Sequence, residues 1–229
     1  MKSKSEGNLN DEVSQSVDDS EHVTMSDQDK AVIDKITQLP VELFSKCEMT
    51  VENGTETYRL QHESHDGSNV FFNQYGEDCR FNLVDGKTGS MYLAETPRTA
   101  LKEVFQNKKG LKESDLEQYY MGVVILEKEA KVLQVKELIK CSNLTVNDVT
   151  LPTRAVTQEL ARKVHNAGFD GMYYESNVTS EDCLVLWHDK PSGKGFATTC
   201  SQTCLSEFEL DGRDAADILV NDLGISVEE

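Results

Sequence analysis

The chain has 229 residues, and its 41 acidic and 23 basic side chains give a formal net charge of −18 at pH 7. Residues 1–30 carry −5 and residues 207–229 carry −7, so the acidic excess is largely terminal. The lack of a basic patch argues against nucleic acid as the main ligand, the acidity argues against an anionic membrane surface, and no apolar run approaches the roughly 20 residues of a membrane span.

The N-terminal residues divide into a polar part and a helix. Residues 1–25 are acidic and poor in aromatic side chains, which predicts a disordered tail. A helix is expected within residues 26–40, with Ser26 as N-cap, acidic residues in its first turn and Pro40 behind its end.

Short strands and turns follow. The stretches "TYRLQ" (57–61), "NVFF" (69–72) and "SMYLAE" (90–95) are typical of strands, and Gly- and Asp-rich turns separate them. The stretch "TALKEVFQN" predicts a helix, with Pro97 near its start, where a missing N–H costs nothing.

The second half contains the longest apolar run. "YYMGVVILE" (119–127) predicts a central strand covered on both faces, and "AKVLQV" (130–135) is expected as its hairpin-like neighbour. Residues 153–168 form an amphipathic helix pattern that ends at Gly168. Two strands are expected in "FDGMYYES" and "DCLVLWH", and a short helix in "DAADILVNDLG".

These elements predict an α+β fold with one domain. We expect a disordered tail over 1–25, a helix over 26–40, the main domain over 41–190 and a C-terminal extension over 191–229 that ends in a short helix. The extension is either a solvating end or a docking segment for a partner.

A small set of polar residues lies in or beside the apolar elements: Arg59, Arg80, Tyr92, Glu103 and Ser176. Taken singly, such an arginine usually faces solvent, such a glutamate lies on the wet face of a helix, and such a serine caps a turn. Together, arginines on strands and an inward carboxylate suit an anionic ligand with a reacting sugar.

The order "YR … RFN … MYLAETPRTALKEVF … FDGMYYES … CLVLW" resembles the RES family, which is named for an arginine, a glutamate and a serine. The resemblance runs from about Leu39 to Asp189. It implies an ADP-ribosyltransferase-like split β-sheet with peripheral helices, as in toxins of Res-Xre toxin–antitoxin pairs. Such proteins consume NAD by cleaving the bond between nicotinamide and ribose, with water or phosphate as acceptor.

By this resemblance, Arg59, Glu103 and Ser176 hold the name-giving positions, and Arg80 and Tyr92 match further active-site positions. The arginines suit the two phosphates of NAD, and tyrosine offers a flat face for nicotinamide and a hydroxyl for the ribose. A carboxylate near the ribose suits an oxocarbenium-like transition state, which predicts a catalytic role for Glu103. Ser176 is expected to bind ribose or phosphate, or to position its loop.

The remaining expectations concern cofactors and partners. NAD is expected as substrate, with no cofactor and no metal, because the loose pairs Cys200/Cys204 and His62/His65 are more typical of ordinary side chains. Scattered cysteines and the lack of an apolar leader indicate action in a cytoplasm, including after delivery to a target cell without a Sec signal. The resemblance implies a separate antitoxin or immunity protein and sometimes a homodimer. Two alternatives stay open: a mono-ADP-ribosyltransferase acting on a protein, and a non-catalytic NAD-binding module.

Overall fold

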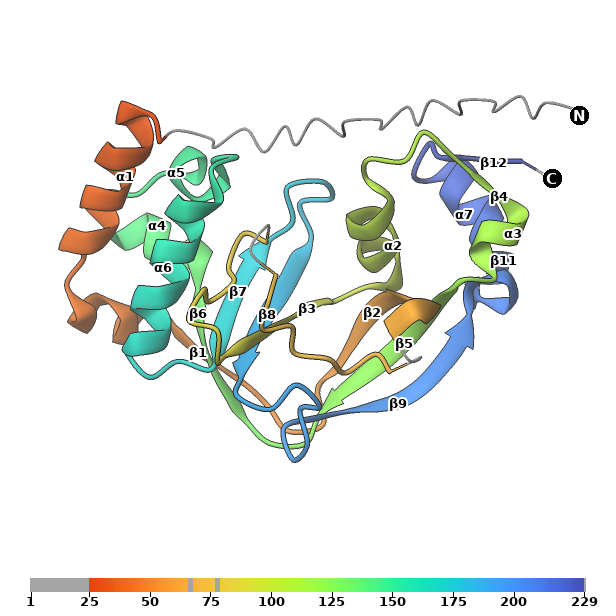
Figure 1. The fold of residues 1–229 in the computed structure, drawn as a ribbon, viewed down its shortest axis with the longest axis horizontal. Coiled ribbons are helices and arrows are strands. Elements are labelled where there is room, and N and C mark those ends of the chain that lie inside the picture. The colour runs from red at the N-terminus through yellow and green to blue at the C-terminus, as the bar shows by residue number, and fades with distance from the viewer. Residues whose placement is uncertain (1–24, 66–67, 77–78, 229) are drawn as a thin grey trace, which may run out of the picture.

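The fold is described from a computed structural model, which defines residues 25–65, 68–76 and 79–228. The expected tail over 1–25 therefore lies, except for Met25, outside the described residues. The main feature is a curled sheet of eight strands with helices around it (Figure 1). In spatial order the strands are β1 (Glu48–Val51), β6 (Ala130–Gln134), β7 (Gly171–Glu175), β8 (Asp182–His188), β3 (Gly89–Ala94), β2 (Glu56–His62), β5 (Tyr119–Leu126) and β9 (Ala197–Cys204).

The sheet is split between β3 and β2. β2 and β3 share a single residue pair, Tyr58 with Ala94, whereas β2 and β5 are in register over their full length from Glu56 to His62. The neighbours are antiparallel except β6 and β7, which run parallel and are joined by a helical crossover. The predicted α+β fold with a split sheet and peripheral helices is confirmed.

The helices form two separate groups along the sheet (Figure 1). One group comprises α1 (Asp27–Gln38), α4 (Val135–Cys141), α5 (Val146–Thr150) and α6 (Arg154–Asn166), and the other comprises α2 (Pro97–Phe105), α3 (Glu113–Leu116) and α7 (Ala215–Asn221). Short 3-10 segments are η1 (Val41–Lys46), η2 (Glu63–His65) and η3 (Leu205–Glu207). Two small ladders join β4 (Gly110–Lys112) to β12 (Ser226–Glu228) and β10 (Glu209–Leu210) to β11 (Arg213–Asp214). Within the described part of the chain, every helix is too short or too polar to cross a membrane.

Both faces of the sheet carry buried side chains, as strand β3 illustrates. Met91 and Leu93 join one apolar cluster, and Tyr92 and Ala94 face the other. Alternation of period two therefore places Tyr92 on the helix-covered face, the side from which α2 approaches.

Local signals in the sequence are confirmed where they depend on neighbouring residues. Ser26 and Asp29 form a reciprocal capping box at the start of α1, and Pro97 is the first residue of α2. Gly168, with φ of +84°, follows the end of α6, where a left-handed residue closes a helix most easily. The predicted strand and helix over residues 90–107 are β3 and α2.

Two expectations about strands are wrong. Residues 69–72 form no strand, because the carbonyls of Asn69 and Phe71 accept hydrogen bonds from Arg59 Nη1, each at 3.0 Å. The two carbonyls are thus bonded to a side chain in place of a neighbouring strand. Residues 130–135 do contain β6, but β6 pairs with β1 and β7 and is not a hairpin partner of β5, whose two edges are taken by β2 and β9.

The main sheet also continues past residue 190. β9 pairs with β5 from Tyr120 to Leu126 and forms one edge of the sheet. The segment expected as a C-terminal extension thus begins with a strand of the central fold, and the predicted helix near its end is α7.

Candidate active site

A cavity of about 410 Å³ opens where the sheet splits. Strands β2 and β3 supply two of its walls, α2 and the start of α6 supply others, and the loop after β7 closes one side. Its polar lining residues are Tyr58, Arg59, Cys79, Arg80, Tyr92, Glu103, Gln106, Arg154, Tyr174, Asn177 and Cys183. Four of the five predicted site residues are among them, and Ser176 is not.

The Arg59 side chain is held by residues 69–72, the segment that was expected to be a strand. Its Nη1 donates to the carbonyls of Asn69 and Phe71, while the Asn69 amide donates back to the Arg59 carbonyl at 2.9 Å. Burial lowers the pKa of Arg59 to about 10, so the guanidinium remains charged at neutral pH. The result is a rigid cation in the wall of the cavity.

The Asn69 side chain needs a gap in β5. A Cβ at Gly122 would overlap the Asn69 amide group, so glycine permits this close approach. Gln202 of β9 donates to Asn69 Oδ1 at 2.8 Å. The edge strand β9 therefore contributes indirectly to the position of Arg59.

Arg80 is held by the short helix α5. Its Nη2 donates to the Val149 carbonyl at 2.8 Å, and its guanidinium lies 4.8 Å from the Phe81 ring centre and 5.5 Å from that of Tyr174. Burial lowers the pKa of Arg80, and the nearby Glu103 carboxylate acts in the opposite direction.

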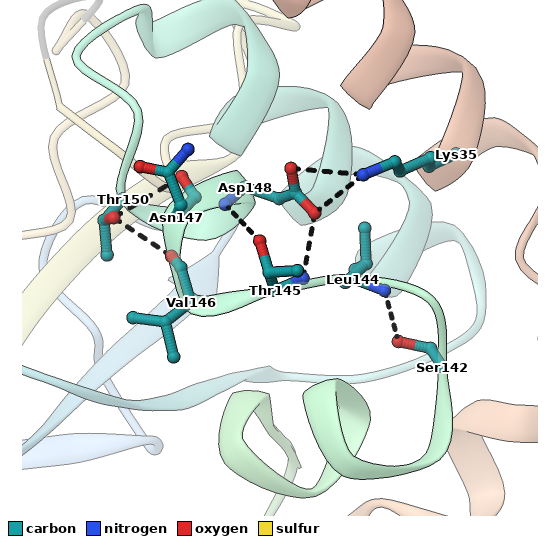
Figure 2. Close-up of polar contacts among 8 residues, drawn as sticks. All are labelled: Lys35, Ser142, Leu144, Thr145, Val146, Asn147, Asp148 and Thr150. Carbon is teal, nitrogen blue, oxygen red and sulfur yellow. Dashed lines mark hydrogen bonds and ion pairs between the residues drawn. The ribbon is translucent and has the colours of Figure 1, made fainter.

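The same helix is anchored to α1. Figure 2 shows the Asp148 carboxylate between the Lys35 ammonium, at 3.1 Å, and the Thr145 backbone N–H, at 2.8 Å. The Asp148 N–H in turn donates to the Thr145 hydroxyl at 3.2 Å. Because α5 has only five residues, these contacts fix the neighbouring Val149 carbonyl and hence Arg80.

The Tyr92 hydroxyl forms two hydrogen bonds within the protein. It donates to Asn82 Oδ1 at 2.8 Å and accepts from the Phe81 N–H at 3.0 Å. Burial raises the pKa of Tyr92 well above its usual value, so the hydroxyl stays protonated. Tyr92 therefore presents its ring, more than its hydroxyl, to the cavity.

Glu103 lies on the cavity side of α2, one turn after Ala100. Among the described residues, Gln106 is the side chain in contact with its carboxylate, at 3.5 Å. The Glu103 charge acts on its neighbours: together with burial it raises the pKa of Cys183 to about 12. Cys183 is thus a neutral thiol and not a nucleophile at neutral pH.

Ser176 shapes the loop beside the cavity. Its side chain is buried, and its Oγ accepts from the backbone N–H groups of Val178, at 3.1 Å, and Thr179, at 3.2 Å. These bonds support the expected loop-positioning role and leave Asn177 and Val178 on the cavity wall.

Arg154, which sequence reasoning missed, supplies a third guanidinium. It is exposed, lines the cavity at the first turn of α6, and its charge is felt by Arg80 and Tyr92. A cation in the first turn of a helix opposes the helix dipole. That mismatch, right after the N-cap Thr153, was the available signal for a functional arginine.

The cavity is thus cationic in a strongly acidic protein. Three arginines and one glutamate line it, although the chain carries a formal charge of −18. Over the described residues, His, Cys, Asp and Glu side chains form no group of three or more with the arrangement of a metal site. The charge pattern favours an organic anion with at least two negative charges.

The family model of the RES domain matches residues 56–207, which include all the cavity residues named above. The chain belongs to the RES domain family. A search of curated proteins gives no match. Among solved structures, the chain is similar to one in the crystal structure of the M. tuberculosis MbcT–MbcA toxin–antitoxin complex, with a TM-score of 0.53, 16% sequence identity, and coverage of 71% of this chain and 90% of that chain.

Proposed function

We propose that this RES domain protein is a toxin that consumes NAD by cleaving the bond between nicotinamide and ribose. The observation that carries the proposal is the meeting of Arg59, Arg80 and Arg154 with Glu103 in one cavity at the split of the sheet. A volume of about 410 Å³ lies within the usual range for small-molecule sites.

The arginines match the diphosphate of NAD. Guanidinium groups bind phosphate through charge-assisted and often bidentate hydrogen bonds, and Arg59 and Arg80 are held in place by carbonyl groups. Arg154 is exposed at the cavity wall and is suited to the second phosphate. The Tyr92 ring offers a face for the nicotinamide.

Glu103 would stabilise the sugar as the bond breaks. The electron pair of the C1′–N bond leaves with nicotinamide, and the positive charge that develops on the ribose lies near the carboxylate. Water then gives ADP-ribose and a proton, and phosphate gives a phosphorylated product. The loose contact of Glu103 with Gln106 supports this role, since the carboxylate is not consumed by a stronger internal pair.

A separate antitoxin would restrain the enzyme. Unrestrained hydrolysis would deplete the NAD of the producing cell, and the fold is similar to that in a toxin–antitoxin complex. The cytoplasm, where the NAD pool lies, would be the site of action.

The test is proton NMR of NAD with the purified protein, with and without phosphate. We expect nicotinamide release, and a fall of about 100- to 1,000-fold in kcat for Glu103→Gln. Glu137→Gln is the matched control, since Glu137 pairs with Lys140 on the surface of α4. Equal rates for wild type and Glu103→Gln would refute the assignment.

The acceptor follows from the same reaction. A sugar product that appears only with phosphate identifies a phosphorylase, and ADP-ribose identifies a glycohydrolase. Transfer of label from NAD to a protein band in a cell extract identifies a transferase. Binding of NAD without turnover in buffer or extract refutes the enzyme and leaves a binding module.

A further inference from the structure

Helix α2 lines the cavity and lies beside the C-terminal segment, defined here as residues 205–228 (Figure 1). Ala100, Glu103 and Val104 line the cavity from α2, whereas Leu101 and Phe105 are buried in the core. The family match ends at residue 207, so nearly all of the segment lies beyond it.

Two polar contacts join α2 to the segment on one helix face. Arg98 Nη2 lies 2.8 Å from Asp222 Oδ2, and one turn later Lys102 Nζ donates to the Leu223 carbonyl at 2.9 Å. Positions four apart point to the same side of a helix, so both contacts lie on a side of α2 that faces away from Glu103.

The end of α2 is joined to the segment as well. β4, which follows α2, pairs in parallel with β12, and Ser226 Oγ donates to the Lys109 carbonyl at 3.1 Å. Apolar side chains of both parts belong to the same large buried cluster: Leu101, Phe105, Leu111, Ile218, Leu219 and Ile225. The segment therefore contacts α2 through Arg98 and Lys102 and pairs with the strand that follows the helix.

Asp222 also corrects a charge mismatch. The first turn of α2 contains Arg98 and no acidic residue, which opposes the helix dipole. Asp222 brings a negative charge to this end, and Arg213 holds the carboxylate by two hydrogen bonds of 2.8 Å each. The Asp222 carboxylate is thus held by a residue of its own segment as well as by its contact with α2.

We propose that the C-terminal segment is a built-in positioning element for α2, and that Asp222 is the positioning residue that sets the place of Glu103. The catalytic consequence rests on the proposed function, and the mechanical part does not. This assigns to the segment an internal role in the active site, in place of a solvating end or a docking arm.

The test combines hydrogen exchange of α2 amides with NAD turnover. Asp222→Asn and, independently, Arg98→Gln should each accelerate exchange of the Ala100–Phe105 amides by about 3- to 10-fold. The double variant should show little further effect on these amides, because the Arg98–Asp222 pair is the contact with α2 that both changes remove, whereas the Arg213–Asp222 pair lies within the C-terminal segment. Asp217→Asn is the control: the same change is made inside α7, the helix that Asp222 caps, and the Asp217 side chain contacts Asn221 within that helix.

Turnover gives the second readout. A shift of the carboxylate by a fraction of an ångström lowers kcat, so Asp222→Asn should lose about 3- to 30-fold in kcat with KM for NAD within about 2-fold. Unchanged α2 exchange in Asp222→Asn overturns the proposal, and so does equal acceleration over β7 and β8, which indicates lost global stability. Normal kcat with loosened α2 overturns the link to Glu103.

The two proposals fail in different ways. If the wild type releases no nicotinamide, the NAD proposal fails while the exchange data still decide whether the segment holds α2. If the wild type turns over and Asp222→Asn matches it in both readouts, the positioning proposal fails alone.

Discussion

The Tyr92 hydroxyl gives the sharpest test of the site geometry. The sequence suggested that it orients the ribose, whereas the structure places it between Asn82 Oδ1, at 2.8 Å, and the Phe81 N–H, at 3.0 Å. Asn82 and Phe81 are buried. Tyr92→Phe should therefore act on stability and leave NAD binding nearly unchanged.

The magnitude follows from the two groups left without a partner. A buried donor or acceptor that loses its hydrogen bond costs about 1–3 kcal/mol. We expect a loss of about 2 kcal/mol if water from the cavity reaches one of the two groups and about 4 kcal/mol if it reaches neither. For a chain of this length that lowers the melting temperature by roughly 5–15 °C.

Unfolding in urea can be followed by fluorescence, because the single tryptophan lies beside this site. Trp187 is buried in β8, and its Nε1 donates to the Phe81 carbonyl at 2.9 Å. Tyr75→Phe is the control, since the Tyr75 side chain is 81% exposed. A free energy of unfolding of Tyr92→Phe within about 0.5 kcal/mol of wild type, together with a KM for NAD raised about 10-fold, would refute the reasoning. It would indicate that the hydroxyl binds the ligand.

Three further predictions test the surroundings of the site. Two threonine hydroxyls lower the pKa of Glu181 below its usual value. The stability that Glu181 contributes is therefore present above about pH 4.5 and is lost as the pH falls through the lowered pKa. Glu181→Gln should flatten the fall of the melting temperature between pH 5 and 3, and an unchanged slope contradicts this. Burial and the neighbouring thiol raise the pKa of Cys47 to about 12, so iodoacetamide should label exposed Cys200 but not Cys47 in the folded protein from pH 7 to 9, which peptide mass spectrometry checks. Asn69→Leu removes buried hydrogen bonds around Arg59 and should cost at least about 2 kcal/mol in urea unfolding and raise KM for NAD; a stable variant with normal KM counts against the support of Arg59 by this residue.

The elements with local signals were predictable from the sequence. The capping box of α1, Pro97 at the start of α2 and Gly168 after α6 act through residues a few positions apart, so pattern and propensity are enough to place them. The cavity residues Arg59, Arg80, Tyr92 and Glu103 were found because the order of motifs resembles the RES family, not because periodicity alone distinguishes them.

Tertiary structure decided how the elements pair and which side chains meet, since the local sequence pattern does not show the partners of an element. Residues 69–72 have a strand-like composition, yet Arg59 takes their carbonyls, and β6 finds its partners in β1 and β7 because β2 and β9 occupy both edges of β5. The place of Arg154 in the cavity, and of Asp222 against the first turn of α2, likewise exist only after the helices pack. The sequence alone determined most of the elements and the chemistry that they carry. Folding determined which side chains from different elements meet, because a contact such as that of Arg98 with Asp222 depends on the packing of the whole chain and leaves no local pattern.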